Sequence, residues 1–438
     1  MRKCGQESFW SIGFHQNPAF SSDLGKKKMK LYLKFIITII FLFQIAAHAG
    51  SVFSASPSGI GLRRYTVSAR GLGMGATGLA SPDSITLTSY SVSKWREIDQ
   101  TRVTISIQYA KFNTEISNSN FSSATGDIGD LNLAIPFTKH KFLLGLSLVP
   151  YSITDFRYTT TIQNSYDLIY EENIFNDGNI TRAQAALIWS PIPKIGISAS
   201  VNYYFGSITD EYILKYNDPN YFDSGYKIDY RIGGPGIGFS FDTTPVQKFM
   251  FAGFVDLKPT ITLKREFTSP ISNAEETLTE SASFPVHFGL GVSYQLFRRL
   301  LLTADYSQQN WSEGIGISAS DTDDSNTITG KTNLDDWYNF GFGIERSAKL
   351  GRGVKFWNGV DLRAGLSTTS LGYKFNGNSV LQYAGHLGLG IPFSRWNRID
   401  FAFAGGIRGT IKDNLAKETF ISFEISISLG EQWFQKLR

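Results

Sequence analysis

Apolar and polar residues alternate with a period of two over many short stretches after residue 50. The alternation is clearest in residues 103–109, 195–205 and 421–429, where every second side chain is aliphatic or aromatic and most of those between are polar or glycine. Successive side chains of a strand point to opposite faces of its sheet. The pattern therefore predicts an all-β chain with one apolar and one polar sheet face, and no long helical periodicity is seen.

The connections between these stretches alternate in length. Short connections are expected at 138–140, 191–194, 242–247, 296–298, 348–354 and 393–396. Long connections are expected near 113–129, 162–179, 208–225, 268–280, 312–335 and 373–380. A soluble sandwich buries its apolar face, whereas an outer-membrane barrel turns that face to lipid and has short periplasmic turns and long external loops. The lengths favour a transmembrane antiparallel β-barrel in the bacterial outer membrane.

The barrel is expected to have about fourteen strands between residues 102 and 429, or sixteen if one long stretch is two strands. Both ends of the barrel then lie on the periplasmic side. Tryptophans occur near the short turns (Trp189, Trp357, Trp396 and Trp433) and near the long loops (Trp311 and Trp337). Aromatic residues gather at both membrane interfaces, so these positions predict two girdles.

An export signal precedes the barrel. A basic cluster at 26–30 is followed by the apolar run 31–45 and by Ala47-His48-Ala49, which fits a cleavage site. Met29 opens a complete signal, so we expect residues 1–28 to be a mis-called upstream extension, residues 29–49 to be a signal peptide, and the mature chain to start at Gly50.

The extension and the signal also determine how the charge and the cysteine count are read. The only cysteine, Cys4, lies in the extension, so no disulfide or thiolate site is expected in the mature chain. Residues 1–49 hold 7 of the 42 basic and 2 of the 38 acidic residues, which leaves 35 basic and 36 acidic residues. The basic balance therefore comes from the leader and gives no indication of nucleic-acid binding.

Three glycines early in the chain, Gly73, Gly75 and Gly78, spell the G-x-G-x-x-G pattern of dinucleotide sites. That reading requires a strand before the motif and a helix after it within a βαβ unit. Pro82 follows closely and would break such a helix. We expect instead that these glycines, with Gly71, let the backbone turn tightly, because glycine accepts positive φ and close contacts.

Several stretches resemble the FadL/TodX/OmpP1 family of outer-membrane transporters for hydrophobic compounds. They are "SARGLGMGATGLASPDS" (68–84), "IPFTKHKFLLGLSLVPYS" (135–152), "FPVHFGLGVSYQLFRRLLLTADYSQQNW" (284–311) and "HLGLGIPFSRWNRIDFAFAGGIRG" (386–409). The resemblance implies a small N-terminal plug or hatch over 50–98, a barrel over 99–430 and a periplasmic tail over 431–438. One departure is that the Asn-Pro-Ala triplet usual in the family is missing from "LTSYSVSKW" (87–95).

Charged residues and one histidine lie on the polar face of the late strands. They are the candidates for lumen lining or ligand contact: Asp305, Glu345, Asp361, Arg363, His386, Asp400, Arg408 and Glu424. Both signs occur, which favours cross-strand ion pairs and barrel rigidity, with ligand guidance or a head-group contact as the alternative. We find no specific pattern of a catalytic or metal site and expect no enzyme activity, no metal and no cofactor.

Two functions remain open, the first as the expected function and the second as its alternative. One is passive uptake of hydrophobic compounds such as long-chain fatty acids, which an apolar pocket would bind and a rearranging plug would release. The other is a non-transporting barrel that acts as a scaffold or in secretion, which the missing triplet favours. The expected partners are outer-membrane lipid and lipopolysaccharide, a hydrophobic ligand, and the barrel assembly machinery during insertion, with no nucleic acid; a monomer is expected.

Overall fold

A computed structural model describes residues 50–54, 60–116, 119–138, 140–163, 169–269, 275–313, 334–349, 351 and 353–431. The predicted extension and signal peptide, Trp433 and nearly all of the predicted tail lie outside the described residues.

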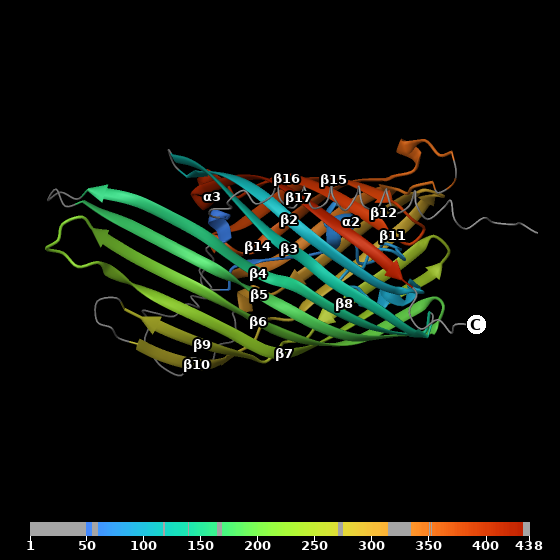
Figure 1. Cartoon of the computed structure of the whole chain (residues 1–438), viewed down its shortest axis with the longest axis horizontal. Helices are drawn as coiled ribbons and strands as arrows, with labels where there is room; N and C mark the ends of the chain where they lie inside the picture. The colour runs from blue at the N-terminus through green and yellow to red at the C-terminus, as the bar shows by residue number, and fades with distance from the viewer. Residues whose placement is uncertain are drawn as a thin grey trace, which may run out of the picture. The chain divides into compact units, whose positions relative to one another are not determined.

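The strands of the wall form one antiparallel sheet that closes on itself (Figure 1). They are β2 (Thr101–Ile116), β3 (Ser119–Thr138), β4 (Phe142–Gln163), β5 (Ile169–Ile192), β6 (Ile195–Tyr216), β7 (Ser224–Val246), β8 (Phe249–Asp256), β9 (Ile261–Thr268), β10 (Glu275–Ala282), β11 (His287–Phe297), β12 (Leu300–Gln309), β13 (Leu334–Arg346), β14 (Asp361–Phe375), β15 (Asn378–Pro392), β16 (Arg398–Arg408) and β17 (Ala416–Glu431). The last strand, β17, pairs with the first strand of the wall, β2, so the sheet closes into a barrel. Closure gives the backbone groups within the bilayer a partner.

Fourteen strands cross the barrel wall, as predicted. β8 and β9 both pair with β7 and follow one another along it, and β11 and β10 pair with them in the same order. Each of these two pairs therefore acts as one crossing strand with a break. Pro259 and Pro285 lie at the breaks, and a proline has no N–H to donate to a ladder.

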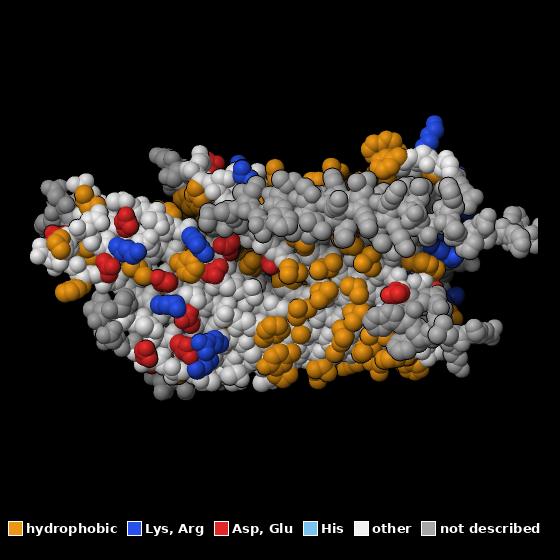
Figure 2. All heavy atoms as spheres, in the orientation of Figure 1, with side chains coloured by type: hydrophobic (Ala, Val, Ile, Leu, Met, Phe, Trp, Pro, Cys, Tyr) orange, Lys and Arg blue, Asp and Glu red, His pale blue; other side chains and the backbone are white. Residues whose placement is uncertain are grey.

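The predicted apolar face points outward. Val201 and Ile421 are 62% and 65% exposed, whereas Ser426 and Asp400 are 0% exposed. Figure 2 shows hydrophobic side chains gathered over the barrel wall. In the described residues, no helix is long and apolar enough to cross a membrane.

Several of the expected long loops are strands. β5 already begins at Ile169 and β6 continues to Tyr216, so the predicted connections 162–179 and 208–225 are mostly paired backbone. Figure 1 shows these strands rising beyond the rest of the barrel at its extracellular end. The sequence pattern missed them because outside the bilayer neither face must be uniformly apolar, so the alternation weakens while the backbone ladder continues.

One of the two predicted tryptophan girdles is wrong. Trp311 and Trp337, expected at the external interface, are only 2% and 1% exposed and belong to an interior cluster with Tyr230. On the periplasmic side, Trp189 and Trp357 are 45% and 66% exposed. Trp337 has the inward parity of its strand, and proximity to a loop does not determine which face a side chain takes.

Residues 50–54 and 60–100, here called the N-terminal segment, lie against the inward faces of the strands. The segment contains η1 (Val52–Ser54), β1 (Leu62–Arg63), α2 (Ser68–Leu72) and η2 (Val92–Glu97). Trp95, 1% exposed, packs with Leu143 of β4 and Ile188 of β5, and β1 pairs with β4. The interior of the barrel is therefore filled by chain from its own N-terminal side.

Candidate functional site: the filled barrel interior

Six charged side chains form a closed ring of alternating sign between the N-terminal segment and the wall, here called the ion-pair ring. Its first half joins α2 to β13 and β14. Arg70 donates to Glu345 at 2.9 Å, and Arg363 donates to the same carboxylate at 2.7 Å. Glu345 and Arg363 are directly opposite one another in the β13–β14 register, so strand pairing alone brings these two together.

The second half of the ion-pair ring returns through β16. Arg363 contacts Asp400 at 2.7 Å, and Arg398 contacts the other oxygen of Asp400 at 2.9 Å. Arg398 also contacts Asp83 of the N-terminal segment at 2.5 Å, and Asp83 lies 3.4 Å from Arg70. Three guanidiniums and three carboxylates therefore alternate, each side chain at most 7% exposed.

The ion-pair ring fixes the protonation of the segment's own carboxylate. Burial by itself would raise the pKa of Asp83, but the adjacent Arg398 and Arg70 outweigh it and hold that pKa below its ordinary value. Asp83 therefore stays ionised. Removing one partner from a buried pair leaves an uncompensated charge and costs about 3–5 kcal/mol, so the ring fastens the segment against displacement.

A second attachment uses Asp305 of β12. Its carboxylate accepts hydrogen bonds from the backbone N–H groups of Gly78 and Leu79, at 2.5 and 2.8 Å. The Lys94 ammonium donates to the carbonyl of Gly78 at 2.6 Å. Burial lowers the pKa of Lys94 to about 8. The turn at Gly78 is thus bonded from both sides.

The glycines of the motif differ in what surrounds them. Gly75 has a φ of +78°, and an added Cβ would lie 2.5 Å from the carbonyl oxygen of Phe342 in β13. A Cβ on Gly73 would lie 2.8 Å from the Cα of Gly388, and one on Gly71 would lie 2.2 Å from a carbonyl of the segment itself. At Gly78 the nearest atom is 3.6 Å away. Gly75 and Gly73 therefore allow close backbone packing against the wall, and Gly71 allows a close turn within the segment.

Three further arginines of the interior were not among the predicted site residues. Arg96 of η2 pairs with Asp242 of β7 at 2.7 Å, Arg182 pairs with Asp256 at 2.7 Å, and Arg63 donates to the Tyr151 carbonyl at 2.7 Å. The alternation along the strands could have identified Asp242, Arg182 and Asp256 as inward-facing. Arg63 and Arg96 lie in the N-terminal segment, where no periodic pattern indicates which way a side chain points.

The predicted candidates therefore separate into groups. Glu345, Arg363 and Asp400 belong to the ion-pair ring, and Asp361 lies beside it, 3.0 Å from Arg363. Arg408 contacts Glu418 across the β16–β17 ladder at 3.2 Å. The remaining candidates are Asp305, described above, and His386 and Glu424, which line a cavity.

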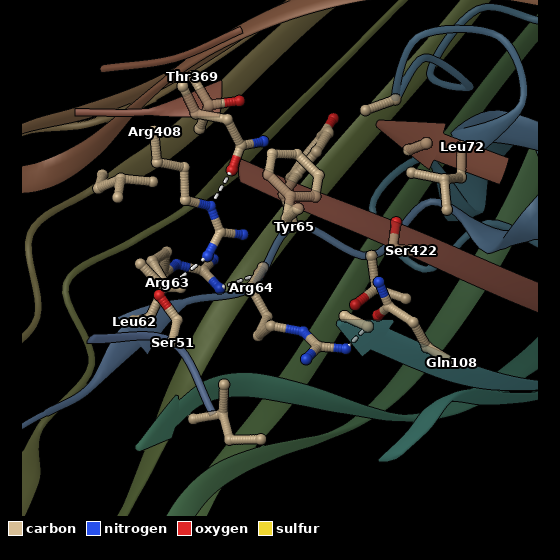
Figure 3. A pocket seen from close by; sticks show the side chains of 18 of the residues that line it. Ser51, Leu62, Arg63, Arg64, Tyr65, Leu72, Gln108, Thr369, Arg408 and Ser422 are labelled. Atoms are coloured by element: carbon tan, nitrogen blue, oxygen red, sulfur yellow. Dashed lines mark hydrogen bonds between the residues drawn. The ribbon is translucent and has the colours of Figure 1, made fainter. Parts of the chain in front are cut away.

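That cavity has a volume of about 150 Å³ and lies between the N-terminal segment and the wall (Figure 3). Arg63, Arg64, Arg408 and Glu424 line it together with polar, aliphatic and aromatic side chains. The hydroxyl of Ser367 is 2.8 Å from Nε2 of His386 at its edge. Among the described residues, no group of three His, Cys, Asp or Glu side chains is placed to hold a metal ion.

The wall next to the cavity is incompletely paired. β3 pairs with β4 only from Leu131 to Thr138, and the described part of β3 above Leu131 pairs with β2 alone. In its place, β1 of the N-terminal segment pairs with Ser152 and Ile153 of β4. β1 of the N-terminal segment therefore pairs with part of the β4 edge that β3 does not reach.

Comparison with known proteins identifies the family. The BamG family profile matches residues 29–438. The chain belongs to the BamG family. No protein of curated function matches it.

Solved structures share the fold of this BamG-family chain at low identity. A FadL homologue of Pseudomonas aeruginosa has 13% identity and a TM-score of 0.57, covering 84% of this chain and 99% of that one. The toluene transporter TodX of P. putida has 13% identity and a TM-score of 0.53, with coverage of 85% and 100%. CymD, described as a monoaromatic hydrocarbon channel, has 13% identity and a TM-score of 0.52, with coverage of 84% and 99%. The predicted FadL-like barrel and its location in the outer membrane are confirmed.

Proposed function

We propose that this chain is a closed outer-membrane barrel that serves as a scaffold next to the barrel assembly machinery and does not transport solutes. The observation that carries the proposal is the ion-pair ring, which ties Arg70 and Asp83 of the N-terminal segment to three strands of the wall. The family match points to the barrel assembly machinery as the partner.

The interior is poorly suited to a greasy solute. Pockets for small apolar ligands measure about 300–1,000 Å³ and are mostly apolar. The cavity beside the N-terminal segment measures only about 150 Å³, and Arg63, Arg64 and Arg408 lie among the apolar and polar side chains that line it. Passage would require the segment to leave its buried ion pairs, at a cost of several kcal/mol for each pair broken.

The experiment is a quantitative co-purification from native membranes. The full chain carries an affinity tag and is extracted in mild detergent, and components of the barrel assembly machinery are measured by mass spectrometry. An unrelated outer-membrane barrel of equal abundance, tagged in the same way, is the control. We expect at least tenfold enrichment over that control, and equal recovery from both baits would refute the proposal.

A hydrophobic-compound channel is the second candidate, and a specific observation favours it. β3 and β4 do not pair with each other next to the cavity, and the fold is shared with proteins described as a monoaromatic hydrocarbon channel and a toluene transporter. Long-chain fatty acids or small aromatic hydrocarbons are the solutes to test. Depletion of the protein should then lower uptake of labelled oleate or toluene at least fivefold, with recovery on complementation. Unchanged uptake of both would exclude this candidate.

A further inference from the structure

The strands that continue beyond the barrel extend its sheet on the extracellular side. This extension is built from residues 154–163 of β4, 169–179 of β5, 207–216 of β6 and 224–233 of β7, followed by β9 and β10, and is here called the extracellular sheet. Figure 1 shows β4–β7 reaching past the other strands at this end.

The two faces of the extracellular sheet differ in chemistry. The outward face carries charged pairs such as Lys227–Asp229 at 2.8 Å and Arg231–Glu266 at 3.2 Å. Figure 2 shows acidic and basic side chains spread over this end of the molecule. A solvated outward face is expected outside the bilayer and requires no partner.

The inner face continues the inward parity of the barrel. Ile208 of β6 and Tyr230 of β7 are directly opposite each other, and both side chains are buried in the interior cluster. They show which alternate positions of these two strands point inward. Higher up the same face, Tyr158, Ile174, Tyr212 and Tyr226 lie side by side in register across four strands. Along this row the inner face is therefore aromatic and aliphatic, whereas the outward face carries charged pairs.

The aromatic row of the inner face is exposed and well ordered by its neighbours. Tyr158 and Tyr226 are 41% and 37% exposed. The rings of Tyr212 and Tyr226 stack at 5.8 Å, and Phe267 of β9 lies 6.5 Å from Tyr226. The Tyr212 hydroxyl donates to Glu172 at 2.9 Å. Tyrosines fixed in this way provide contact area at low entropic cost, which is why they are enriched in protein interfaces.

The charge of the inner face selects among possible occupants. By strand register it carries four carboxylates and one guanidinium: Glu172, Asp210, Glu276, Glu280 and Arg265. An acidic face repels the anionic groups of lipopolysaccharide and attracts a cationic surface, because complementary potentials favour association. A protein that presents Lys or Arg around apolar side chains satisfies both the charge and the aromatic row.

We propose that the inner face of the extracellular sheet docks a partner protein through a cationic and apolar surface. The proposal rests on the scaffold function and adds a second contact to it, on the side of the membrane opposite the periplasmic turns. Among the described strands, residues 156–162 of β4 pair with β5 alone, so their other edge offers backbone groups that an extended partner segment can also use.

Site-specific photo-crosslinking in native cells tests the proposal with the full chain. The photoreactive residue p-benzoylphenylalanine replaces Tyr212 on the inner face or Glu211, its neighbour on the outward face, as the matched control. We expect one discrete protein adduct from position 212, at least ten times stronger than from position 211. The crosslinked peptide of the partner should contain Lys or Arg beside apolar residues.

Two further variants test the charge and the aromatic row of the inner face. Glu276→Lys with Glu280→Lys reverses charge on the inner face, and Tyr212→Ala with Tyr226→Ala removes the aromatic row, with crosslinking for the latter moved to position 158. Each should reduce the adduct at least tenfold, whereas Glu211→Ala with Lys227→Ala, which changes a paired couple on the outward face, should leave it unchanged. Heat-modifiable gel mobility verifies that every variant is folded.

The other outcomes overturn the inference. They are no adduct from position 212, equal adducts from both faces, an adduct to lipopolysaccharide alone, or a protein adduct that is insensitive to charge reversal. The scaffold function is judged separately by co-purification with the barrel assembly machinery. Co-purification without an inner-face adduct refutes the docking surface alone, and an adduct without co-purification refutes the association with the machinery alone.

Discussion

Replacing Arg70 by methionine tests whether the ion-pair ring holds the N-terminal segment in place. Methionine keeps much of the apolar stem and removes the guanidinium that contacts Glu345 at 2.9 Å and Asp83 at 3.4 Å. Each carboxylate keeps one other arginine, Glu345 with Arg363 and Asp83 with Arg398. The loss therefore falls at the low end of the range for breaking a buried pair, about 3 kcal/mol.

Hydrogen exchange of the segment's own amides measures this loss. The N–H groups of Gly73 and Thr77 are bonded to carbonyls of Ala69 and Gly71 at 3.0 and 3.1 Å, so their exchange reports opening of the segment. At about 1.4 kcal/mol per tenfold change, 3 kcal/mol increases the opened population and the exchange rate about 100-fold. The measurement is made on the folded barrel in detergent.

Arg231→Met is the matched control. It breaks another Arg–Glu pair, Arg231–Glu266 at 3.2 Å, whose arginine is 62% exposed. Exposed pairs contribute about 0–1 kcal/mol, so exchange in the segment should not change. If Arg70→Met accelerates exchange of Gly73 and Thr77 by less than threefold, the reasoning about the ring is wrong.

Three other predictions concern the glycines, the pH response and the lipid face. Gly75→Ala should speed proteolysis between residues 60 and 100, because the new Cβ would lie 2.5 Å from a carbonyl oxygen of the wall and the backbone φ is +78°. Gly78→Ala, whose Cβ would have its nearest neighbour at 3.6 Å, should be cleaved at the wild-type rate. Faster cleavage of Gly78→Ala than of Gly75→Ala would contradict this prediction. The ring lowers the pKa of Asp83, so the ionised carboxylate stabilises the folded state fully above the unfolded pKa of about 4. This stabilisation is lost progressively as the pH falls below that value. The protection of the segment's amides, which is the intrinsic exchange rate at each pH divided by the measured rate, should fall over that acid range in wild type and more weakly in Asp83→Asn, and identical pH profiles would count against it. Ile425 lies on the outward face of β17, so Ile425→Arg should destabilise the folded barrel by about 2–4 kcal/mol and reduce the heat-modifiable folded form on gels. Ile425→Leu should leave that form unchanged. Equal folding of the two variants would show that this face is not in lipid.

The sequence by itself determined the barrel and the faces of its strands. Because side chains alternate with a period of two, the pattern of apolar residues assigned Glu345, Arg363 and Asp400 to the interior before any contact was known. The requirement that the bilayer imposes on the outward face is strong, and it leaves a strong signal in the sequence.

The tertiary structure decided what these inward charges do. The ion-pair ring depends on Asp83, which contacts Arg398 315 positions away, and on Arg70, which lies in a segment without periodicity. Local pattern cannot place such a segment, because its position is fixed by contacts with many strands at once. The extracellular sheet escaped prediction for the opposite reason. Outside the bilayer the environment no longer dictates one apolar face, so Tyr212, in the expected connection 208–225, was identified as a strand residue only by its pairing with Tyr226.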